Sequence, residues 1–571
     1  MYWFIIGIVR ICGLLYCTIL PVDNYCYHIN MLNWIREHTI LCIFIVAFVL
    51  YVPSLFGKFV WDDEDFVYAN TYVQQFQVGK FFTENAIAGR GGKQSNYYRP
   101  IQEMTYSLEY KLVGQNPFLY HLDNNILHAL VGVVLYLVLL EIGAPYIIAL
   151  FTSLFFVIHP VQTEAVSYIS GRSDMLYVLF LGLSMLFFLK EKVEKRWYSL
   201  LFFVLALLSK ETALIGIVLF PAGSWLQNKK IIDSLKRTVP YVLLVCIYLV
   251  FRFTILEFQA SSVVWGNTQY ATSVVVRVST FFRSYFTYVR LLLFPYGLHM
   301  ERDLTTPIVQ SLYTWWTVFF LLFQMVVLFL CYVLYRVKKC VGKIWVVGYL
   351  VFSACLAFYS GIILLNGIFY EHYLYFALLF FYLLLVSGLF SLLPKKGAVV
   401  LLSLYICVLM VVNVRRQYVW ASPVRFYTQT LSYAPQSVRI RNGLAMAYAD
   451  EHEIDKAIEE YNKIIKEGNV VVNVYHNLAN AYATNQNYAQ AERYYLKAIE
   501  TQRSFHFSYL ALVDMYIQTN GRKKLINVLP KLEKMGEGNK AALYAVARGY
   551  EFVGNKGKAG IYFELCCGVQ Q

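Results

Sequence analysis

Residues 41–66 read LCIFIVAFVLYVPSLFGKFVWDDEDF, an apolar run followed by four consecutive acidic residues, Asp62, Asp63, Glu64 and Asp65. The apolar stretch at 38–56 is long enough to cross a bilayer as a helix. Carboxylates at the point where a helix leaves the bilayer cost little to solvate and lie within reach of a lipid headgroup. This placement predicts a membrane enzyme with its chemistry at the end of the first crossing helix.

The composition agrees with a polytopic membrane protein. Of the 571 residues, 58% are hydrophobic and 15% are charged, which is too apolar for a soluble globule of this length. The net charge is +14, but the basic residues cluster between apolar segments, where they orient helices and meet anionic headgroups. Nucleic-acid binding is therefore not expected. The cysteines lie mostly inside apolar segments without metal-ligand spacing, and the adjacent Cys566 and Cys567 remain unexplained.

The apolar stretches predict about eleven membrane crossings. They lie near 38–56, 121–141, 145–158, 175–189, 197–209, 212–226, 238–257, 313–335, 344–364, 372–393 and 397–413. The segment 276–294 differs because Arg277, Arg283 and Arg290 recur along it. We expect it to lie at the membrane interface or to line a cavity without crossing.

Eleven crossings satisfy the positive-inside rule and place the C-terminal region outside the cytoplasm. The basic clusters then expected in the cytoplasm are Arg36; Lys190, Lys192, Lys195 and Arg196; Lys229, Lys230, Lys236 and Arg237; Arg336, Lys338, Lys339 and Lys343; and Lys395 and Lys396.

The chain is expected to divide into a membrane domain at 38–415, a linker at 416–437 and a soluble domain at 438–571. Pro423 and Pro435 are expected to interrupt the helix-compatible linker. Residues 1–37 form an extension of uncertain status. A start at Met31 and a genuine extra anchor beginning at Met1 remain equal alternatives.

The C-terminal domain carries a 34-residue repeat. Equivalent positions are Leu444, Leu478, Leu512 and Val546; Tyr448, Tyr482, Tyr516 and Tyr550; Ala457, Ala491 and Ala559; and Tyr461, Tyr495 and Phe563. Only the third repeat departs from this pattern, with Leu525 and Leu529 at the alanine and aromatic positions. This period and its alternation of large and small residues are typical of tetratricopeptide repeats. We expect an all-α solenoid that binds a polypeptide, with a spacer or oligomerisation module as the alternative.

The predicted topology gathers distinctive polar residues on the outer face. They are Asp62, Asp63, His159, Glu164, Arg172, Asp174, Lys210, Glu211, Glu371 and His372. Charges scattered at random would populate both faces, whereas the inner loops are basic and carry few distinctive motifs. The outer loops therefore predict a functional site.

Several motifs in these loops resemble one family. They are FVWDDEDFVYAN at 59–70, NYYRPI at 96–101, NPFLYHLDNNILHA at 116–129, HPVQTEAVSYISGRSD at 159–174, LLSKETALIG at 207–216 and EHYLY at 371–375. Together they resemble the transmembrane and tetratricopeptide repeat-containing protein O-mannosyltransferases and their bacterial relatives, over most of the chain from about residue 38. The resemblance implies a GT-C membrane glycosyltransferase fold. It further implies transfer of a sugar, mannose above all, from a polyprenyl phosphate to protein Ser or Thr hydroxyls outside the cytoplasm.

The resemblance implies that Asp62 or Asp63 is the base that takes the acceptor proton, and the sequence does not separate the two. No metal ligand set is assigned and no cofactor is required. A divalent cation held with the help of Glu64 and Asp65 is the less favoured alternative, since these mannosyltransferases generally do not need one. A solvated acidic loop that reinforces topology is the remaining interpretation of the run.

Arginine and lysine side chains are the expected partners of the donor phosphate. The candidates are Arg99, Arg172 and Lys210, followed by Arg283 and Arg290. Arg172 could instead pair with Asp174, and Lys210 with Glu211 or another carboxylate.

The remaining polar residues of the outer loops are expected to position substrate. They are His159, Glu164, Asp174, Glu211, Glu371 and His372. His159, which precedes Pro160, could equally be a structural helix end, and His372 stands where relatives often carry arginine.

The expected partners are therefore the polyprenyl-phosphate sugar, a polypeptide acceptor and membrane lipid. A transporter for lipid-linked sugar and a membrane-anchored scaffold are the alternative functions; the membrane part has no convincing internal repeat of the kind that transporters carry. The absence of Asn-x-Ser/Thr sequons favours a bacterial plasma membrane over the endoplasmic reticulum.

Overall fold

The computed structural model describes residues 38–190, 195–256, 268–362, 367–468 and 470–568. The predicted extension 1–37, with Arg36, and the predicted cytoplasmic Lys192 lie outside these ranges. Within them the chain is helical and contains no strand, which confirms the all-α prediction. The chain divides into two compact units, the first ending at Ser422 and the second beginning at Pro423.

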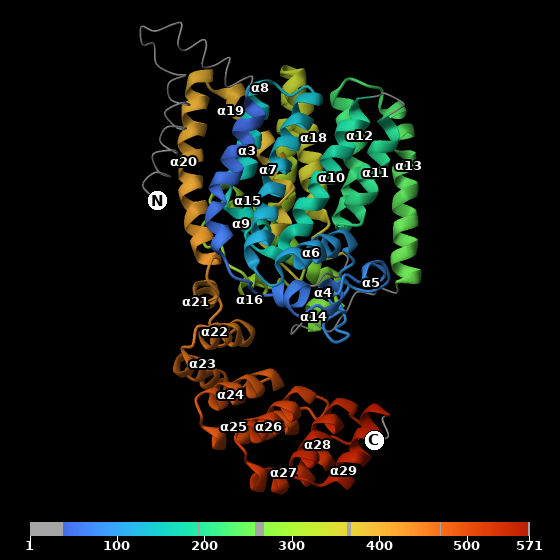
Figure 1. Ribbon diagram of the computed structural model, residues 1–571. Coiled ribbons are helices and arrows are strands. Elements are labelled where there is room, and N and C mark those ends of the chain that lie inside the picture. Colours follow the sequence, from blue (N-terminus) through green and yellow to red (C-terminus); the bar gives the residue numbers. More distant parts are fainter. Residues whose placement is uncertain (1–37, 191–194, 257–267, 363–366, 469, 569–571) are drawn as a thin grey trace. The chain divides into compact units, whose positions relative to one another are not determined.

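In the described part of the first unit, seven helical segments are long and apolar enough to span a membrane. They are α3 with the short helix η1 (Thr39–Phe56), α7 (Pro117–Glu141), α10 with η4 (Ile169–Leu189), α13 with the start of η7 (Ile231–Thr254), α17 (Trp315–Val337), α18 (Lys339–Ala357) and α20 (Lys395–Trp420). Figure 1 shows α3, α7, α10, α13, α18 and α20 of this set in one bundle.

The other apolar stretches also form helices. Tyr146–Ile158 (α8) and Pro160–Val166 form a pair bent by 47°, and the shorter apolar helices are Arg196–Leu207 (α11), Glu211–Leu226 (η6 and α12) and Ala377–Leu392 (α19). Each of the eleven predicted stretches therefore contains a helix. The number that crosses the membrane stays a prediction.

The bend after α8 follows from its sequence. A residue that precedes proline is driven out of the helical conformation, and His159 before Pro160 has an extended ψ of 131°. The chain then folds into three short turns, η3 (Pro160–Gln162), α9 (Thr163–Val166) and η4 (Ile169–Gly171). Every residue of these turns is buried. The bend thereby brings the polar groups of this segment inside the bundle end.

Short helices cover the same end of the bundle, as Figure 1 shows for α4, α5 and α6. They are η2 (Glu64–Tyr68), α4 (Thr71–Gln74), α5 (Val78–Thr83) and α6 (Pro100–Val113). They share an apolar core of their own that includes Phe66, Tyr106 and Tyr120. This core fixes the acidic run, which lies directly before and within η2, against α6 and the start of α7.

The arginine-bearing segment forms α15 (Val274–Leu293), which packs within the bundle. Its Tyr285 ring lies 5.2 Å from Phe320 of α17 and 6.1 Å from Phe352 of α18. Two short helices flank α15, α14 (Thr268–Thr272) and α16 (Arg302–Thr305), and η9 (Glu371–Leu374) precedes α19.

The second unit is a series of paired helices, as predicted for tetratricopeptide repeats. They are α21 (Pro423–Tyr433), α22 (Val438–Asp450), α23 (Ile454–Glu467), α24 (Val472–Thr484), α25 (Tyr488–Thr501), α26 (His506–Gln518), α27 (Arg522–Met535), α28 (Lys540–Phe552) and α29 (Lys556–Cys567). The small residues Ala457 and Ala491 are fully buried, and so are Leu525 and Leu529, which replace the usual pair in the third repeat.

The predicted linker 416–437 is largely helical. The last helix of the first unit, α20, continues to Trp420, and Pro423 occupies the first turn of α21, where proline is tolerated. Helix α21 ends at Tyr433, before Pro435. Both prolines therefore mark the helix breaks expected of them.

The third repeat predicts a sharp difference between two neighbouring side chains of α27. Leu529 is fully buried and packs against Gly549, whereas Ile526 is 49% exposed. In the isolated segment 423–571, Leu529→Ala should lower the free energy of unfolding by about 2–5 kcal/mol because it leaves a cavity. Ile526→Ala should change it by about 0.5 kcal/mol or less. Urea unfolding followed by circular dichroism measures both, and equal effects would contradict the packing.

Candidate active site

A narrow cavity lies where α10 begins and α18 ends. Six of the residues singled out by sequence line it: Asp62, Arg99, Asp174, Lys210, Glu211 and His372. Aromatic side chains supply much of the remaining wall, among them Trp61, Tyr97, Tyr168, Tyr359, Tyr370 and Tyr373. Loops far apart in the sequence thus bring carboxylates, cations and rings together at one end of the bundle.

The structure separates the two aspartates that the sequence could not. Asp62 is half-buried and lines the cavity, and its backbone N–H donates to the Tyr168 hydroxyl over 3.2 Å. The preceding Trp61 has a φ of +56°, in the left-handed region that bulky residues rarely adopt. This turn leads directly into the two aspartates. Such backbone strain is concentrated at functional sites.

Asp63 is fully buried behind the cavity wall. Its Oδ1 accepts hydrogen bonds from the Ser170 backbone N–H (2.8 Å) and hydroxyl (2.6 Å), and its Oδ2 accepts one from the Val60 N–H (3.0 Å). Burial raises the pKa of Asp63 to about 7, although these hydrogen bonds favour ionisation. Asp63 therefore anchors the acidic loop to the turn at Ser170, and of the two carboxylates Asp62 is the one that lines the cavity.

The other two acids of the run face the loop at 85–93. Glu64 pairs with Arg90 over 2.8 Å, and Asp65 pairs with both Arg90 and Lys93. Two cations therefore compensate the extra charge. Within the described ranges, no group of three or more His, Cys, Asp and Glu side chains is placed to hold a metal ion.

Arg99 is the cation with the most open coordination in the cavity. It is 8% exposed, and its guanidinium lies 4.6 Å from the centre of the Tyr97 ring and 6.0 Å from that of Phe66. Its buried Nε has no hydrogen-bond partner, and Arg99 makes no ion pair with the described residues. A buried guanidinium normally has an anionic or polar partner, so this group is available to an anionic ligand.

Lys210 is already paired. Its Nζ lies 2.7 and 2.8 Å from the two carboxylate oxygens of Asp174, and both residues are almost fully buried. Burial lowers the pKa of Lys210 despite this pairing. Beside them, Glu211 Oε2 is buried without a hydrogen-bond partner. The Lys210–Asp174 pair and Glu211 are distant from the acidic loop in sequence. They line the same cavity as Asp62 and give it a polar wall.

His372 reaches the cavity from η9. Its Nδ1 lies 2.6 Å from Glu164 Oε1, and its ring stacks on Tyr370. Glu164 itself is buried and also accepts the Glu371 backbone N–H over 3.1 Å. Glu164 thus orients His372 from behind and does not line the cavity.

Glu371 is part of a buried ionic network outside the cavity. Its Oε1 accepts hydrogen bonds from Arg302 Nε and Nη2 at 2.9 and 2.7 Å and from the His299 N–H at 2.8 Å. Its Oε2 lies 3.4 Å from Arg416 Nη2. These contacts join η9 to α16 and α20. We assign Glu371 a structural role in place of the predicted contact with substrate.

Four more predicted residues lie elsewhere. Arg172 is fully buried and binds Asn124 Oδ1, Thr105 Oγ1, the Tyr120 carbonyl and Glu109, so its ion pair is with Glu109 and not with Asp174, and it does not line the cavity. His159 accepts the Val161 N–H at its helix end and contacts the Leu292 carbonyl, which fits the structural alternative. Arg283 lies over the Trp316 ring, and Arg290 bonds the Tyr296 carbonyl. Neither arginine of α15 lines the cavity.

Sequence reasoning missed the partners that hold the site. Tyr168 and Ser170 lie inside the motif already singled out at 159–174, and their hydroxyls were a signal that this turn could bind the acidic loop: Tyr168 accepts the Asp62 N–H, and Ser170 donates to Asp63. Arg302 and Arg416 lie outside the quoted motifs. An arginine next to an apolar helix needs a carboxylate partner, and this was the only signal that could have indicated them.

These features define a polytopic, all-helical membrane protein that carries a charged cavity at the ends of its helices and a C-terminal tetratricopeptide unit. A family model for the tetratricopeptide repeat matches residues 472–505.

Curated proteins match parts of the chain as well. A protein O-mannosyl-transferase of Caenorhabditis elegans is 29% identical over 206 residues, which cover 35% of this chain and 30% of the relative. Protein O-mannosyl-transferase Tmtc1 of Drosophila melanogaster is 30% identical over 30% of this chain and 21% of its own length. Protein O-mannosyl-transferase TMTC1 of Homo sapiens is 37% identical over 24% and 16%, respectively. Over these segments the chain is therefore homologous to protein O-mannosyl-transferases, TMTC proteins among them.

The matched segments span less than a third of these relatives. The relatives are animal proteins and give no support to the predicted bacterial setting.

The raised pKa of Asp63 predicts a pH-dependent stability. The folded protein keeps a proton that the unfolded chain loses between about pH 4 and 7, so this group contributes less to the free energy of unfolding as pH rises through that range. Asp63→Asn cannot titrate. The melting temperature of the wild type relative to this variant should therefore fall between pH 5 and 7 and level off above, as measured by tryptophan fluorescence of the detergent-solubilised protein. A constant difference would contradict the buried environment.

Proposed function

We propose that this chain is a membrane glycosyltransferase that moves a sugar, mannose, from a polyprenyl phosphate to Ser or Thr hydroxyls of a polypeptide. The observation that carries the proposal is the convergence of a half-buried carboxylate, Asp62, and an unpartnered buried cation, Arg99, on one cavity at the bundle end. The names of the homologous proteins support the sugar and the acceptor class.

The reaction needs a base and a site for the leaving phosphate. Asp62 takes the proton from the acceptor hydroxyl as the oxygen attacks the anomeric carbon of the donor. The bond between that carbon and the phosphate oxygen breaks, and the phosphate leaves with the electron pair. The new glycosidic bond replaces the broken one, so the carboxylate ends protonated and no metal or redox partner is required.

Arg99 receives the phosphate in this proposal. A guanidinium presents a planar set of donors that fits phosphate oxygens, and its attraction is stronger in a partly desolvated site. Tyr97 holds the guanidinium in place from one side, as its ring distance of 4.6 Å indicates. Lys210 acts less directly, because Asp174 already neutralises it.

Several rings that line the cavity offer surfaces for a sugar. Tyr168, Tyr370 and Tyr373 carry hydroxyls beside an apolar face, which suits a ligand with both C–H and O–H groups. His372, held by Glu164, offers its second ring nitrogen to sugar or acceptor hydroxyls.

By the positive-inside rule this end of the bundle and the repeat unit lie outside the cytoplasm, where the repeats would bind the acceptor polypeptide. The membrane is that of the endoplasmic reticulum or, alternatively, a bacterial plasma membrane.

The role of Asp62 is tested by comparing it with its neighbour Glu64. Asp62→Asn should reduce sugar transfer by about 10²-fold or more, because the base is lost while shape is kept. Glu64→Gln is the matched control, since Glu64 pairs with Arg90 and does not line the cavity. The measurement is transfer of radiolabelled mannose from polyprenyl-phosphate mannose to a Ser/Thr peptide by the purified full-length protein. Transfer by Asp62→Asn at the wild-type rate would contradict the role of Asp62. Absence of transfer by the folded wild type would favour the scaffold alternative, and donor movement across vesicles without transfer would favour a transporter.

The role of Arg99 predicts a specific effect on the donor. Arg99→Ala should lower kcat/KM for the donor by about 10²-fold because the phosphate loses its cation. Arg99→Lys should recover part of this loss, since lysine keeps the charge without the planar fork. Arg283→Ala should leave kcat/KM unchanged, because Arg283 lies over Trp316 outside the cavity. A loss at Arg283 with none at Arg99 would move the phosphate site to α15.

A further inference from the structure

The last helix of the second unit, α29, exposes two neighbouring apolar side chains. Ile561 and Leu565 are each 56% exposed and lie one helical turn apart on the same side of the helix. Gly557 and Glu564 belong to this side as well, four residues before Ile561 and three after it. Figure 1 shows α29 beside α28 at the C-terminal end of the repeats. We call the surface formed by Gly557, Ile561, Glu564 and Leu565 the α29 face.

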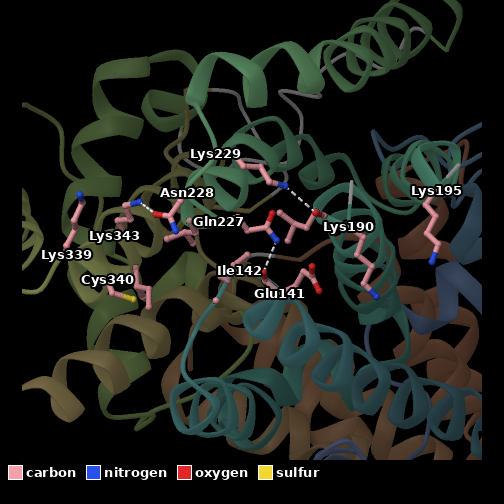
Figure 2. Close-up of a pocket in the computed structure, with 14 residues that line it drawn as sticks. Glu141, Ile142, Lys190, Lys195, Gln227, Asn228, Lys229, Lys339, Cys340 and Lys343 are labelled. Carbon is pink, nitrogen blue, oxygen red and sulfur yellow. Dashed lines mark hydrogen bonds between the residues drawn. The ribbon is translucent and has the colours of Figure 1, made fainter. Parts of the chain in front are cut away.

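In the first unit, exposed apolar side chains have a partner in the lipid. Many of them lie along helices that are long and apolar enough to span a membrane, such as α17. The ends of such helices carry charge, as Figure 2 shows for Lys190 and Lys339 around a cavity of about 1070 Å³. No such helix occurs among the described residues of the second unit, so the α29 face needs another explanation.

The repeat shows that these positions are ordinarily polar. The 34-residue period aligns Ile561 and Leu565 with two positions in each of the three preceding repeats. Five of the six aligned residues are exposed, and the side chain of the sixth, Lys463, is 43% exposed, although a further repeat follows each of them. Packing of one repeat on the next therefore does not cover these positions, and of the four aligned helices only α29 places apolar residues there. The aligned residues are Glu459, Arg493 and Asn527 for Ile561, and Lys463, Lys497 and Lys531 for Leu565.

Glycines beside the two apolar side chains leave room for another helix. Apart from the backbone of α29 itself, a Cβ atom added at Gly560 would meet no described atom within 4 Å. One added at Gly557 would meet only Asn555 Oδ1, at 3.9 Å. Because no side chain stands there, a second backbone can approach closely and cover Ile561 and Leu565.

We propose that the α29 face binds the same face of a second copy of this chain, with the two helices antiparallel. Such a two-fold contact joins identical patches, so each patch must be complementary to itself. When the pair is centred on Ile561, Leu565 comes level with Gly557 of the other copy, where no side chain opposes it. Glu564 comes level with Lys558 of the other copy, so opposite charges meet on both sides of the centre.

The charges favour a protein partner over lipid. Glu564 is exposed on the same face as the apolar side chains, and a carboxylate is costly against hydrocarbon. The side chain of Lys558 is 44% exposed and donates to Glu533 over 3.0 Å and to the Tyr550 hydroxyl over 3.2 Å. An ammonium group has three donors, so Lys558 keeps one for Glu564 of the other copy.

The contact is small, which sets its expected strength. One 12-residue helix from each copy buries less than the roughly 1,600 Å² of a standard interface. We therefore expect a weak dimer that forms where anchoring in one membrane raises the local concentration of the chain. The contact involves the repeat unit alone and does not depend on the proposed transferase activity.

The test is disulfide cross-linking of the full-length protein in phosphatidylcholine vesicles. Ile561→Cys places a thiol at the centre of the proposed pair, and Val471→Cys is the matched control because Val471 is 53% exposed at the start of α24. Both variants carry C566S/C567S, so that the neighbouring thiols do not compete. Copper phenanthroline is the oxidant, and non-reducing gel electrophoresis measures the rate at which linked dimers form.

We expect dimers of Ile561→Cys to form on the order of 10-fold faster than those of Val471→Cys. Adding Gly557→Leu should slow Ile561→Cys on the order of 10-fold, because the new side chain blocks the close approach although it has space in the single copy. Circular dichroism checks that each variant is folded.

Equal rates for Ile561→Cys and Val471→Cys would overturn the proposal. A rate that Gly557→Leu leaves unchanged or raises would also overturn it, since the contact would then be unspecific adhesion of apolar surface. The membrane is the other possible occupant. Protection of the thiol of Ile561→Cys from a membrane-impermeant maleimide in nanodiscs that hold a single copy, but not in detergent, would assign the face to lipid and overturn the second copy as its partner.

Discussion

Charge at the end of a membrane helix is stable only if it is paired, hydrogen-bonded or exposed to water, because each ion loses several kcal/mol of hydration on burial. This constraint shapes the active-site end of the bundle. Arg172 binds Glu109, Lys210 binds Asp174, and Glu371 is held by two arginines. Breaking such a pair leaves a charge without compensation, so these contacts fix the loops that carry them. The cavity is built on the loops fixed in this way.

Against this background, the unpartnered Arg99 is the exception that gives the site its chemistry. Every other buried cation of this end described above has a carboxylate in direct contact, whereas Arg99 contacts the faces of two aromatic rings and interacts with Glu211 only through its charge. A buried guanidinium without a directly bound carboxylate costs stability, and binding of an anion to it recovers part of that stability. The anchored Asp63 similarly frees its neighbour Asp62 to line the cavity. One carboxylate supports the loop, and the other faces the ligand.

Much of the fold could be predicted from sequence because its signals are local. The apolar stretches and the 34-residue repeat gave the helices of both units, and the repeat persists through the replacement by Leu525 and Leu529 because both leucines stay buried. The gathering of Lys210, Glu211 and His372 into one cavity also followed from topology.

The roles of single charges could not be predicted, because they depend on partners distant in sequence. Arg172 was expected to bind phosphate or Asp174, yet its ionic partner is Glu109 on α6. The separation of Asp62 from Asp63 depends on the positive φ of Trp61 and on Ser170, more than 100 residues away. Neither contact leaves a periodic pattern in the sequence.

The most direct test of the account is the position of the donor phosphate. Electron cryomicroscopy of the full-length protein with a non-transferable polyprenyl-phosphate mannose analogue would locate it. The account predicts phosphate density within hydrogen-bonding distance of Arg99, with the sugar between Tyr168 and His372 and the anomeric carbon facing Asp62. Density for the phosphate beside Arg283 and Arg290 of α15, with the active-site cavity empty, would contradict it.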